Sequence, residues 1–154
     1  MSLSELIKPD AVIAALRVNG KKQALQEMSE RAALVSNLPS REVFDALLQR
    51  ERLGSTGVGD GVAIPHGKLT KCEGIFGVFA RLERPIDFDA PDGMPVDLIF
   101  MLIAPEFAGA DHLKALAMSA RLLRNGSIAA QLRATRDPTA LYALLTMAPT
   151  SNAA

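Results

Sequence analysis

The segments GIFGVFARL (residues 74–82) and VDLIFMLIA (residues 96–104) are the most strongly β-forming parts of this chain. Aromatic and β-branched residues recur in both, and such residues fit the pleated, half-buried surface of a sheet. The apolar run that begins at Leu98 is far shorter than the ~20 residues that span a bilayer, so it predicts a buried strand. The turn-rich segment DAPDGMP (89–95) separates the two strands, and a short strand is expected between them at 85–88.

Helical patterns lie on both sides of these strands along the chain. Alternating apolar residues at 12–18 predict a further strand, which the Asn19-Gly20 turn connects to the first helix. The expected helices lie from about 20 to 34, after Pro39-Ser40, between Pro105 and Asn125-Gly126, at 127–134, and from Asp137-Pro138 onward. In the third of these helices, the positions expected to face the core are Leu113, Leu116, Ala117, Ala120 and Leu123.

This alternation of elements implies an α/β fold in which helices flank both faces of a β-sheet. The sheet is expected to be mixed rather than purely parallel, because the central strands lie close together along the chain. A chain of 154 residues removes ~70% of its extended surface from water on folding, enough for a core without disulfide or metal staples. We therefore predict one domain over residues 1–149 and a flexible tail at 150–154.

Charge and composition exclude several classes of function. The 17 Lys and Arg residues balance the 17 Asp and Glu residues, so the chain lacks the clustered basic face that nucleic acids require. Lys8, Pro9 and Asp10 stand where a signal peptide needs an apolar stretch, and no apolar run is long enough for membrane insertion, so a cytoplasmic location is expected. One Cys and two His at no recognisable ligand spacing predict no metal site, and Cys72 is expected to be an incidental surface thiol.

The segment LGSTGVGDGVAIPHG (53–67) differs in composition from the rest of the chain, because it contains five glycines, at 54, 57, 59, 61 and 67. We expect its backbone, rather than side chains, to hold this loop. A GxGxG spacing is one feature of nucleotide-binding loops. However, the Lys-Ser/Thr of a Walker A motif and the strand–loop–helix order of a dinucleotide fold are both missing. Nucleotide binding is therefore rejected, and no cofactor is expected.

His66 ends this segment between Pro65, which restricts one backbone dihedral angle, and Gly67, which permits an unusual one. These neighbours can present the imidazole in a set orientation at the end of a short strand at 62–64. Because the ordinary pKa of imidazole lies near neutrality, nucleophilic or acid–base chemistry at pH 7 points to the histidines. An exposed loop histidine with no functional role explains the same pattern equally well.

Two further residues are candidates for the same chemistry. His112 follows Asp111 at the start of a helix, where unpaired N–H groups and the helix dipole disfavour an imidazolium and can hold an anion. A histidine that only packs in the first turn is the simpler explanation there. Arg50 continues the apolar stripe of Val43 and Leu47, so its guanidinium can either bind an oxyanion near His66 or extend past the core to solvent.

The run LGSTGVGDGVAIPHGK (53–68) resembles the active-site signature of the enzyme IIA components of the phosphoenolpyruvate-dependent sugar phosphotransferase system, in the fructose/mannitol class. The segments PIDFDAPDGMPVDLIFMLIAPE (85–106) and HLKALAMSARLL (112–123) are similar to the rest of that family's core. The resemblance covers essentially the whole chain, in order, and within the family it is greatest to the nitrogen-regulatory branch, IIA-Ntr. It implies the mannitol-type IIA fold, a mixed β-sheet flanked by helices.

The resemblance also implies roles for the three candidate residues. His66 would receive a phosphoryl group from a phosphohistidine on an HPr-like carrier protein such as NPr. Arg50, sixteen residues earlier, would contact that phosphoryl group, and His112 would be the second active-site histidine. A neutral His66 needs an acceptor for its other nitrogen, which we expect to be a backbone carbonyl of the glycine-rich segment. Exposed apolar residues such as Val58 are expected to form the docking patch for the carrier.

The expected function is therefore a regulatory phosphocarrier, a component of a phosphotransferase. Phosphorylation adds nearly two negative charges, so the state of His66 would decide which cytoplasmic partners, such as kinases or transporters, the protein binds. One alternative is a sugar-specific IIA that passes phosphate to a IIB component for uptake of fructose or mannitol. Another is a binding module that has kept the motif without the reaction.

Overall fold

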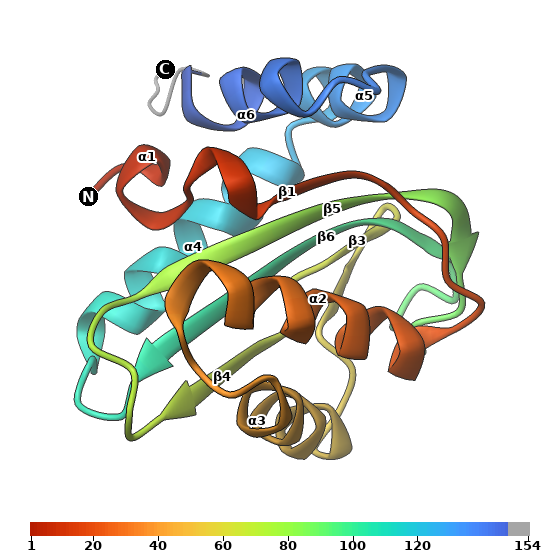
Figure 1. Ribbon diagram of the computed structural model, residues 1–154. Helices are drawn as coiled ribbons and strands as arrows, with labels where there is room; N and C mark the ends of the chain where they lie inside the picture. The colour runs from red at the N-terminus through yellow and green to blue at the C-terminus, as the bar shows by residue number, and fades with distance from the viewer. Residues whose placement is uncertain (148–154) are drawn as a thin grey trace.

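A computed structural model describes residues 1–147 of the protein, and six strands of this part of the chain form one mixed sheet (Figure 1). The strand order is β1-β5-β6-β3-β2, and β4 also pairs with β6. The predicted α/β fold with a mixed sheet is thus confirmed. The strands are β1 (Val12–Leu16), β2 (Gly57–Gly59), β3 (Val62–Ala63), β4 (His66–Leu69), β5 (Phe76–Ile86) and β6 (Val96–Pro105).

The two segments with the strongest β-forming composition pair with each other at the centre of the sheet. β5 runs antiparallel to β6, and β1 runs parallel to β5 on its other side. Both β3 and β4 run parallel to β6, with Val62 opposite Leu98 and His66 opposite Leu102. The glycine-rich segment therefore follows one edge of the central strand, and this register sets the position of His66.

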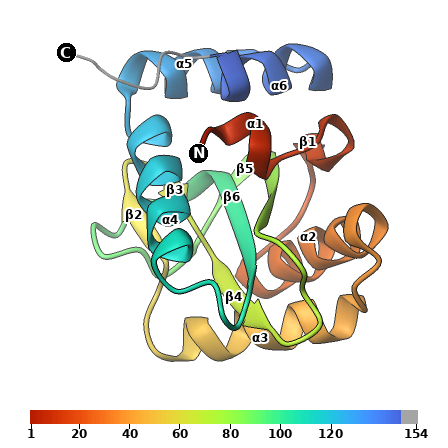
Figure 2. The same cartoon turned by 90° about the vertical axis from the view of Figure 1, so that its left-hand side faces the viewer.

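Helices cover both faces of the sheet, as predicted. Figure 2 shows α2 and α4 on opposite sides of the central strands, with α3 beside β4 and with α1, α5 and α6 grouped near β1. The helices are α1 (Leu3–Leu6), α2 (Lys21–Ser36), α3 (Ser40–Arg52), α4 (Ala110–Leu123), α5 (Gly126–Ala134) and α6 (Pro138–Met147), with a 3-10 turn η1 at Pro9–Ala11.

Local sequence signals account for several helix ends. Asn125 caps α5, since its side-chain oxygen accepts hydrogen bonds from the backbone N–H groups of Ser127 (3.0 Å) and Ile128 (3.2 Å). Asp137 caps α6 in the same way, accepting from the N–H of Ala140 at 2.9 Å, as its place before Pro138 predicts. These caps set the residues at which α5 and α6 begin.

The core lies on both faces of β6. Every residue from Leu98 to Ala104 is buried, which confirms the strand predicted from the apolar run. Residues 85–88 do not form a separate strand, because β5 continues without a break from Phe76 to Ile86. That prediction is wrong because the register shift between Arg81 and Ile86 lets one long strand pass the point where Pro85 suggested a boundary.

The buried face of α4 agrees with the predicted one only in part: Leu123 is buried and Leu116 and Ala120 pack against the core, as expected. Leu113 is 67% exposed and Ala117 is exposed, whereas His112, Ala115 and Ser119 face the core. Ser119 is buried without an unpaired hydroxyl, because it donates to the Ala115 carbonyl at 2.8 Å. The positions of the apolar residues did not fully predict the buried face of α4, because two polar side chains, His112 and Ser119, are buried there.

Cys72 is buried rather than on the surface, so the expectation of an exposed thiol is wrong. Its Sγ donates to the Gly74 carbonyl at 3.1 Å, and burial raises the pKa of the thiol. The sequence did not indicate this burial, because the charged residues on either side of Cys72 suggested a surface position. Lys71 and Glu73 are indeed exposed, but the side chain between them points inward.

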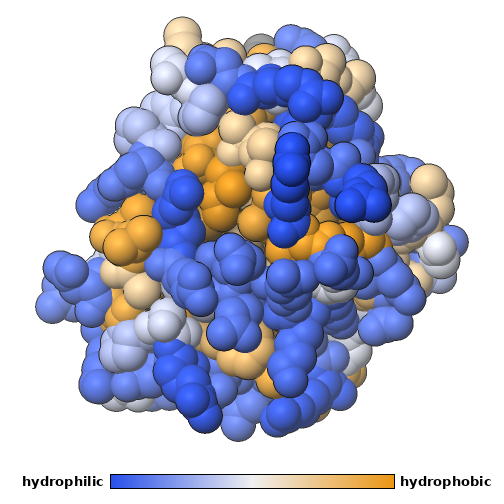
Figure 3. All heavy atoms as spheres, turned by 45° about the vertical axis from the view of Figure 1, so that its right-hand side comes forward, coloured by the Kyte–Doolittle hydropathy of each residue, from blue (hydrophilic) through white to orange (hydrophobic). Residues whose placement is uncertain are grey.

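Hydrophilic residues cover most of the face seen in Figure 3, with smaller hydrophobic areas between them. None of the helices in residues 1–147 is both long enough and apolar enough to cross a membrane. The predicted domain end at 149 and the tail expected at 150–154 lie outside the described residues.

Candidate active site at the end of the glycine-rich segment

His66 is the first residue of β4 and is held by backbone contacts on both sides. The preceding residue, Pro65, accepts a hydrogen bond from the Leu102 N–H at 2.9 Å, which fixes the chain against β6. The His66 ring nitrogen Nδ1 lies 2.9 Å from the Ile64 carbonyl oxygen. Because a carbonyl only accepts, Nδ1 carries the proton and Nε2 keeps a free electron pair. The backbone acceptor predicted within the glycine-rich segment is therefore the Ile64 carbonyl.

The surroundings of His66 favour a neutral imidazole. Its ring is half-buried, and burial is the largest cause that lowers its pKa below the ordinary value. The positive charge of Arg50 acts in the same direction, while the Ile64 hydrogen bond and the negative charge of Glu51 oppose it. A neutral ring with an unprotonated Nε2 is the form in which a histidine acts as a nucleophile.

His112 faces His66 from the first turn of α4. The two ring centroids are 5.5 Å apart, and the rings are tilted by 57°. The pKa of His112 is lowered, first by burial and then by the charges of His66 and Lys68. Its Nδ1 is buried and has no hydrogen-bond partner among the described residues. Burial therefore disfavours an imidazolium here, in the same direction as the helix dipole invoked from the sequence.

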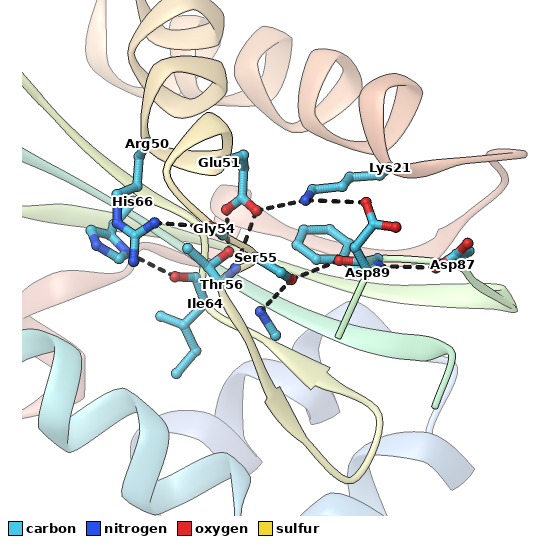
Figure 4. Close-up of polar contacts among 12 residues, drawn as sticks. Lys21, Arg50, Glu51, Gly54, Ser55, Thr56, Ile64, His66, Asp87 and Asp89 are labelled. Carbon is cyan, nitrogen blue, oxygen red and sulfur yellow. Dashed lines mark hydrogen bonds and ion pairs between the residues drawn. The ribbon is translucent and has the colours of Figure 1, made fainter. Parts of the chain in front are cut away.

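Arg50 comes from the last turn of α3 and reaches the same place. Its side chain lies beside His66 (Figure 4), and its guanidinium donates to the Gly54 carbonyl at 2.9 Å. Arg50 is half-buried, so it neither sits in the core nor extends freely into solvent. The structure thus brings together the three residues singled out from the sequence, His66, His112 and Arg50, from three different elements.

The glycine-rich segment forms the hairpin of β2 and β3 and is held by side chains as well as by its backbone. Asp92 accepts from the Asp60 N–H at 3.0 Å, and Ser55 donates to the Phe88 carbonyl at 2.7 Å. Arg133 donates to the Asp60 carbonyl at 2.7 Å. The expectation that only the backbone holds this loop is therefore wrong, because the residues that hold it are distant in sequence.

Sequence reasoning missed Glu51, Thr56 and Lys21, a polar group next to Arg50 and His66 in which Glu51 and Thr56 are buried. Glu51 accepts hydrogen bonds from Thr56 and forms an ion pair with Lys21 (Figure 4). A signal was present, because Val43, Leu47 and Glu51 follow one another at intervals of four residues on α3. A carboxylate that continues a buried apolar stripe needs a partner.

The apolar surface near the site differs from the one expected. Val58 is half-buried and packs against the core, so it is not the exposed patch that was predicted. Three of the large apolar side chains that are exposed are instead Leu53, at the start of the glycine-rich segment, Phe107, just before α4, and Leu113, next to His112. They lie along the chain next to the elements that carry Arg50 and His112.

Comparison with known proteins gives a consistent result. Residues 5–148 match the sequence model of a family described as "Phosphoenolpyruvate-dependent sugar phosphotransferase system, EIIA 2". A nitrogen regulatory protein of Bradyrhizobium diazoefficiens is 60% identical over 153 residues, covering 99% of this chain and 100% of that protein. One from Escherichia coli strain K12 is 42% identical over 147 residues, covering 95% of this chain and 90% of that protein.

Solved structures and sugar-specific proteins are also similar. The crystal structure of nitrogen regulatory protein IIA-Ntr from Neisseria meningitidis is 38% identical, with a TM-score of 0.87 over 92% of this chain and 97% of that one. The structure of IIA mannitol from Escherichia coli, at 19% identity and a TM-score of 0.77 over 90% of this chain and 98% of that one, shares the fold. The fructose-specific EIIABC component of Bacillus subtilis is 32% identical over 133 residues, covering 86% of this chain and 21% of that protein.

Proposed function

Because this chain belongs to the EIIA 2 family of the phosphoenolpyruvate-dependent sugar phosphotransferase system, we propose that it is a regulatory phosphocarrier that is phosphorylated on His66. Its similarity to nitrogen regulatory proteins over almost its whole length favours regulation over sugar uptake. The observation that carries the proposal is the hydrogen bond from His66 Nδ1 to the Ile64 carbonyl, which leaves Nε2 as the ring nitrogen with a free electron pair.

In the proposed reaction, His66 Nε2 attacks the phosphorus of a phosphohistidine on an HPr-like carrier such as NPr. A new P–N bond forms at Nε2 while the P–N bond to the carrier breaks, and the electron pair of that bond returns to the carrier's imidazole. Such a transfer needs mainly an in-line nucleophile and groups that balance the charge on the phosphoryl oxygens. The donor and the acceptor are both imidazoles. His66 supplies the nucleophile, and Arg50 and His112 supply the groups that balance the charge.

Arg50 and His112 are assigned to the phosphoryl oxygens. The Arg50 guanidinium is charged and stands beside His66, so it offsets the negative charge that arrives with the phosphoryl group. The neutral ring of His112, 5.5 Å from that of His66, is placed to donate a hydrogen bond to one oxygen. Both residues act in the transition state more than in holding the fold together.

The exposed side chains Leu53, Phe107 and Leu113 are proposed as the docking face for the carrier and for regulated proteins such as kinases or transporters. Phosphorylation would place nearly two negative charges at this face, which changes partner choice by repulsion and by the cost of desolvation. The proposal includes a cytoplasmic location, because the carrier and the regulated proteins that it names act there. Cell fractionation would test that location.

The experiment is phosphorylation in a reconstituted relay with labelled phosphoenolpyruvate, the upstream enzyme and the carrier. We expect one acid-labile phosphoryl group on His66, none on His66→Ala, and label retained on Arg52→Ala, a matched exposed-residue control. Label on His112 of the His66→Ala protein would overturn the assignment. Partner affinity that is the same for the unmodified protein, the phosphorylated protein and His66→Asp would instead identify a binding module without the reaction.

A second candidate function is favoured by the similarity to the fructose-specific EIIABC component. In that case the chain passes its phosphoryl group to a IIB component for sugar uptake. The two functions are separated by mixing the phosphorylated protein with fructose- and mannitol-specific IIB proteins. Rapid transfer to either would favour transport, and its absence would favour regulation.

A further inference from the structure

Glu51 is a buried carboxylate next to the site, and the roles assigned above do not use it. Its side chain is 3% exposed, and its Oε1 lies 2.8 Å from the Lys21 ammonium at the start of α2. Lys21 also lies 3.8 Å from an Asp89 carboxylate oxygen and 4.8 Å from the centre of the Phe88 ring. Burying a charge is costly unless it is paired and hydrogen-bonded, so this arrangement calls for an explanation beyond packing.

Among the described residues, the other hydrogen bonds of the Glu51 side chain go to one residue of the glycine-rich segment. Its Oε1 accepts from the Thr56 backbone N–H at 3.1 Å, and its Oε2 accepts from the Thr56 hydroxyl. Thr56 is itself 5% exposed. One carboxylate therefore holds both the backbone and the side chain of Thr56, which fixes that peptide unit in place.

Thr56 connects Glu51 to the histidine through two more hydrogen bonds. The Thr56 carbonyl accepts from the Ile64 N–H at 3.0 Å, and the Ile64 carbonyl accepts from His66 Nδ1 at 2.9 Å. Figure 4 shows these residues lying between α3 and β4. The chain of contacts thus runs from the Glu51 carboxylate to the ring nitrogen opposite the proposed nucleophilic nitrogen.

The neighbouring residue on α3 holds the same segment from the other side. Arg50 donates to the Gly54 carbonyl at 2.9 Å, two residues before Thr56. Consecutive residues at the end of α3 therefore fix the segment 54–56. The same segment therefore contacts both Arg50, through the Gly54 carbonyl, and Ile64, through the Thr56 carbonyl.

We propose that Glu51 is a positioning residue for phosphoryl transfer: acting through Thr56 and Ile64, it keeps the proton of the neutral His66 ring on Nδ1 and thereby leaves Nε2 as the nucleophile. The inference rests on the proposed phosphorylation of His66. Lys21 makes the role possible by compensating the buried carboxylate, and the pairing leaves the hydrogen-bonding capacity of Glu51 directed at Thr56. The negative charge of Glu51 also raises the pKa of His66, against the larger effect of burial.

The first test is made without any phosphorylation, by ¹⁵N NMR of the His66 ring in the unmodified protein at a pH where the ring is neutral. The variants are Glu51→Gln, which removes the charge at constant shape, and Thr56→Val, which removes only the hydroxyl contact. Glu42→Gln is the matched control, because Glu42 forms an exposed ion pair with Lys71 at the other end of α3. We expect Nδ1–H alone in the wild type and the control, and a measurable population of Nε2–H in both variants.

The second test is the rate of phosphoryl transfer from the carrier. We expect the maximal rate of Glu51→Gln to fall by about 10- to 100-fold with little change in the carrier concentration at half-maximal rate, because the nucleophile is misplaced while the docking face is intact. Thr56→Val keeps the test usable if Glu51→Gln does not fold. A folded variant with Nδ1–H alone would overturn the proposal, whether its transfer is slow or fast.

The two proposals fail in different ways. A wild-type protein that takes no phosphoryl group, while its His66 tautomer still depends on Glu51, would overturn the proposed function and leave the coupling from Glu51 to His66 standing. A wild-type protein that is phosphorylated normally, with a tautomer and transfer rate unaffected by both variants, would overturn the role of Glu51 alone.

Discussion

Gly67 and Ala46 bring β4 and α3 into direct contact: a β-carbon on Gly67 would stand 3.0 Å from the Ala46 β-carbon and 3.2 Å from its carbonyl carbon. Ala46 lies one helical turn before Arg50, and Gly67 directly follows His66. The absence of a side chain at Gly67 therefore sets how closely the guanidinium approaches the imidazole.

Gly67→Ala is expected to push α3 away from β4, because backbone atoms of Ala46 cannot move as a flexible side chain can. Overpacking of this kind costs about 1–3 kcal/mol of unfolding free energy. We also expect slower phosphorylation, since Arg50 is displaced with the helix. Urea unfolding and transfer kinetics measure both effects, and Gly74→Ala is the control, since a β-carbon there meets nothing within 4 Å. Equal stability for the two variants would contradict this prediction.

Arg50→Ala is expected to slow phosphoryl transfer by about 10²- to 10³-fold, the usual effect of removing one group that stabilises the transition state. The fold should stay intact, because Arg50 is half-buried and its hydrogen bond goes to the Gly54 carbonyl at the surface. Single-turnover kinetics measure the rate, and circular dichroism checks the fold. Arg52→Ala, an exposed arginine on the same helix, should transfer at the wild-type rate. Equal transfer rates for the two variants would show that Arg50 takes no part in phosphoryl transfer.

His112→Ala is expected to remain phosphorylated on His66, because the nucleophile and its tautomer are set by the Ile64 carbonyl rather than by His112. Transfer should slow by about 10²-fold, since one proposed donor to the phosphoryl oxygens is lost. Arg121→Ala, an exposed position near the other end of α4, serves as the control. A variant that takes no label on His66 even at long reaction times would contradict this prediction.

Stability is expected to fall as the pH drops below about 6.5. The pKa values of His66 and His112 are both lowered from their ordinary value of 6.5 in the folded protein, so the unfolded chain binds protons first. Their contribution to stability is complete above the unfolded pKa and is lost as the pH falls toward the folded values. Urea unfolding at pH 7.5 and pH 5.5 measures the difference. The double variant His66→Gln/His112→Gln should show a weaker pH dependence, and an unchanged slope would contradict this assignment.

Arg133→Met is expected to lower the unfolding free energy by about 1–3 kcal/mol. Arg133 Nε lies 2.9 and 3.0 Å from the two Asp97 carboxylate oxygens, and the guanidinium also donates to the Asp60 carbonyl at the turn of the β2–β3 hairpin. It therefore ties α5 to β6 and to the hairpin. Arg136→Met is the control, since its contact with Glu83 at 3.3 Å is exposed and should contribute less than about 0.5 kcal/mol. Equal losses in the two variants would contradict this account.

Much of the architecture could be predicted because the relevant signals are local. The apolar run at 98–104 predicts a buried strand in any tertiary context, and the capping role of Asp137 depends on the next three residues alone. Strands β2 and β4 were not predicted. They are short and glycine-containing, and they exist because β3 and β6 offer them partners.

The residues of the candidate site also divide into those that local sequence signals predict and those that they do not. His66, between Pro65 and Gly67, and Arg50, on an apolar stripe, were identifiable from spacing and from resemblance to a known family. Leu113 was expected to face the core but is exposed, whereas His112 is buried. The core-facing side of α4 is decided by contacts with the rest of the molecule, and these turned His112 inward and Leu113 outward.

The sequence by itself determined the central strands, the flanking helices and the histidine that ends the glycine-rich segment, because periodicity, caps and local dihedral restrictions act over a few residues. Only the tertiary structure decided which nitrogen of His66 carries the proton and why Glu51 is buried. The ion pair with Lys21 joins Glu51 to a residue far away in the chain, and the hydrogen bond from His66 to the Ile64 carbonyl, although it joins near neighbours, depends on how the folded segment orients the ring. Neither contact leaves a periodic trace in the sequence.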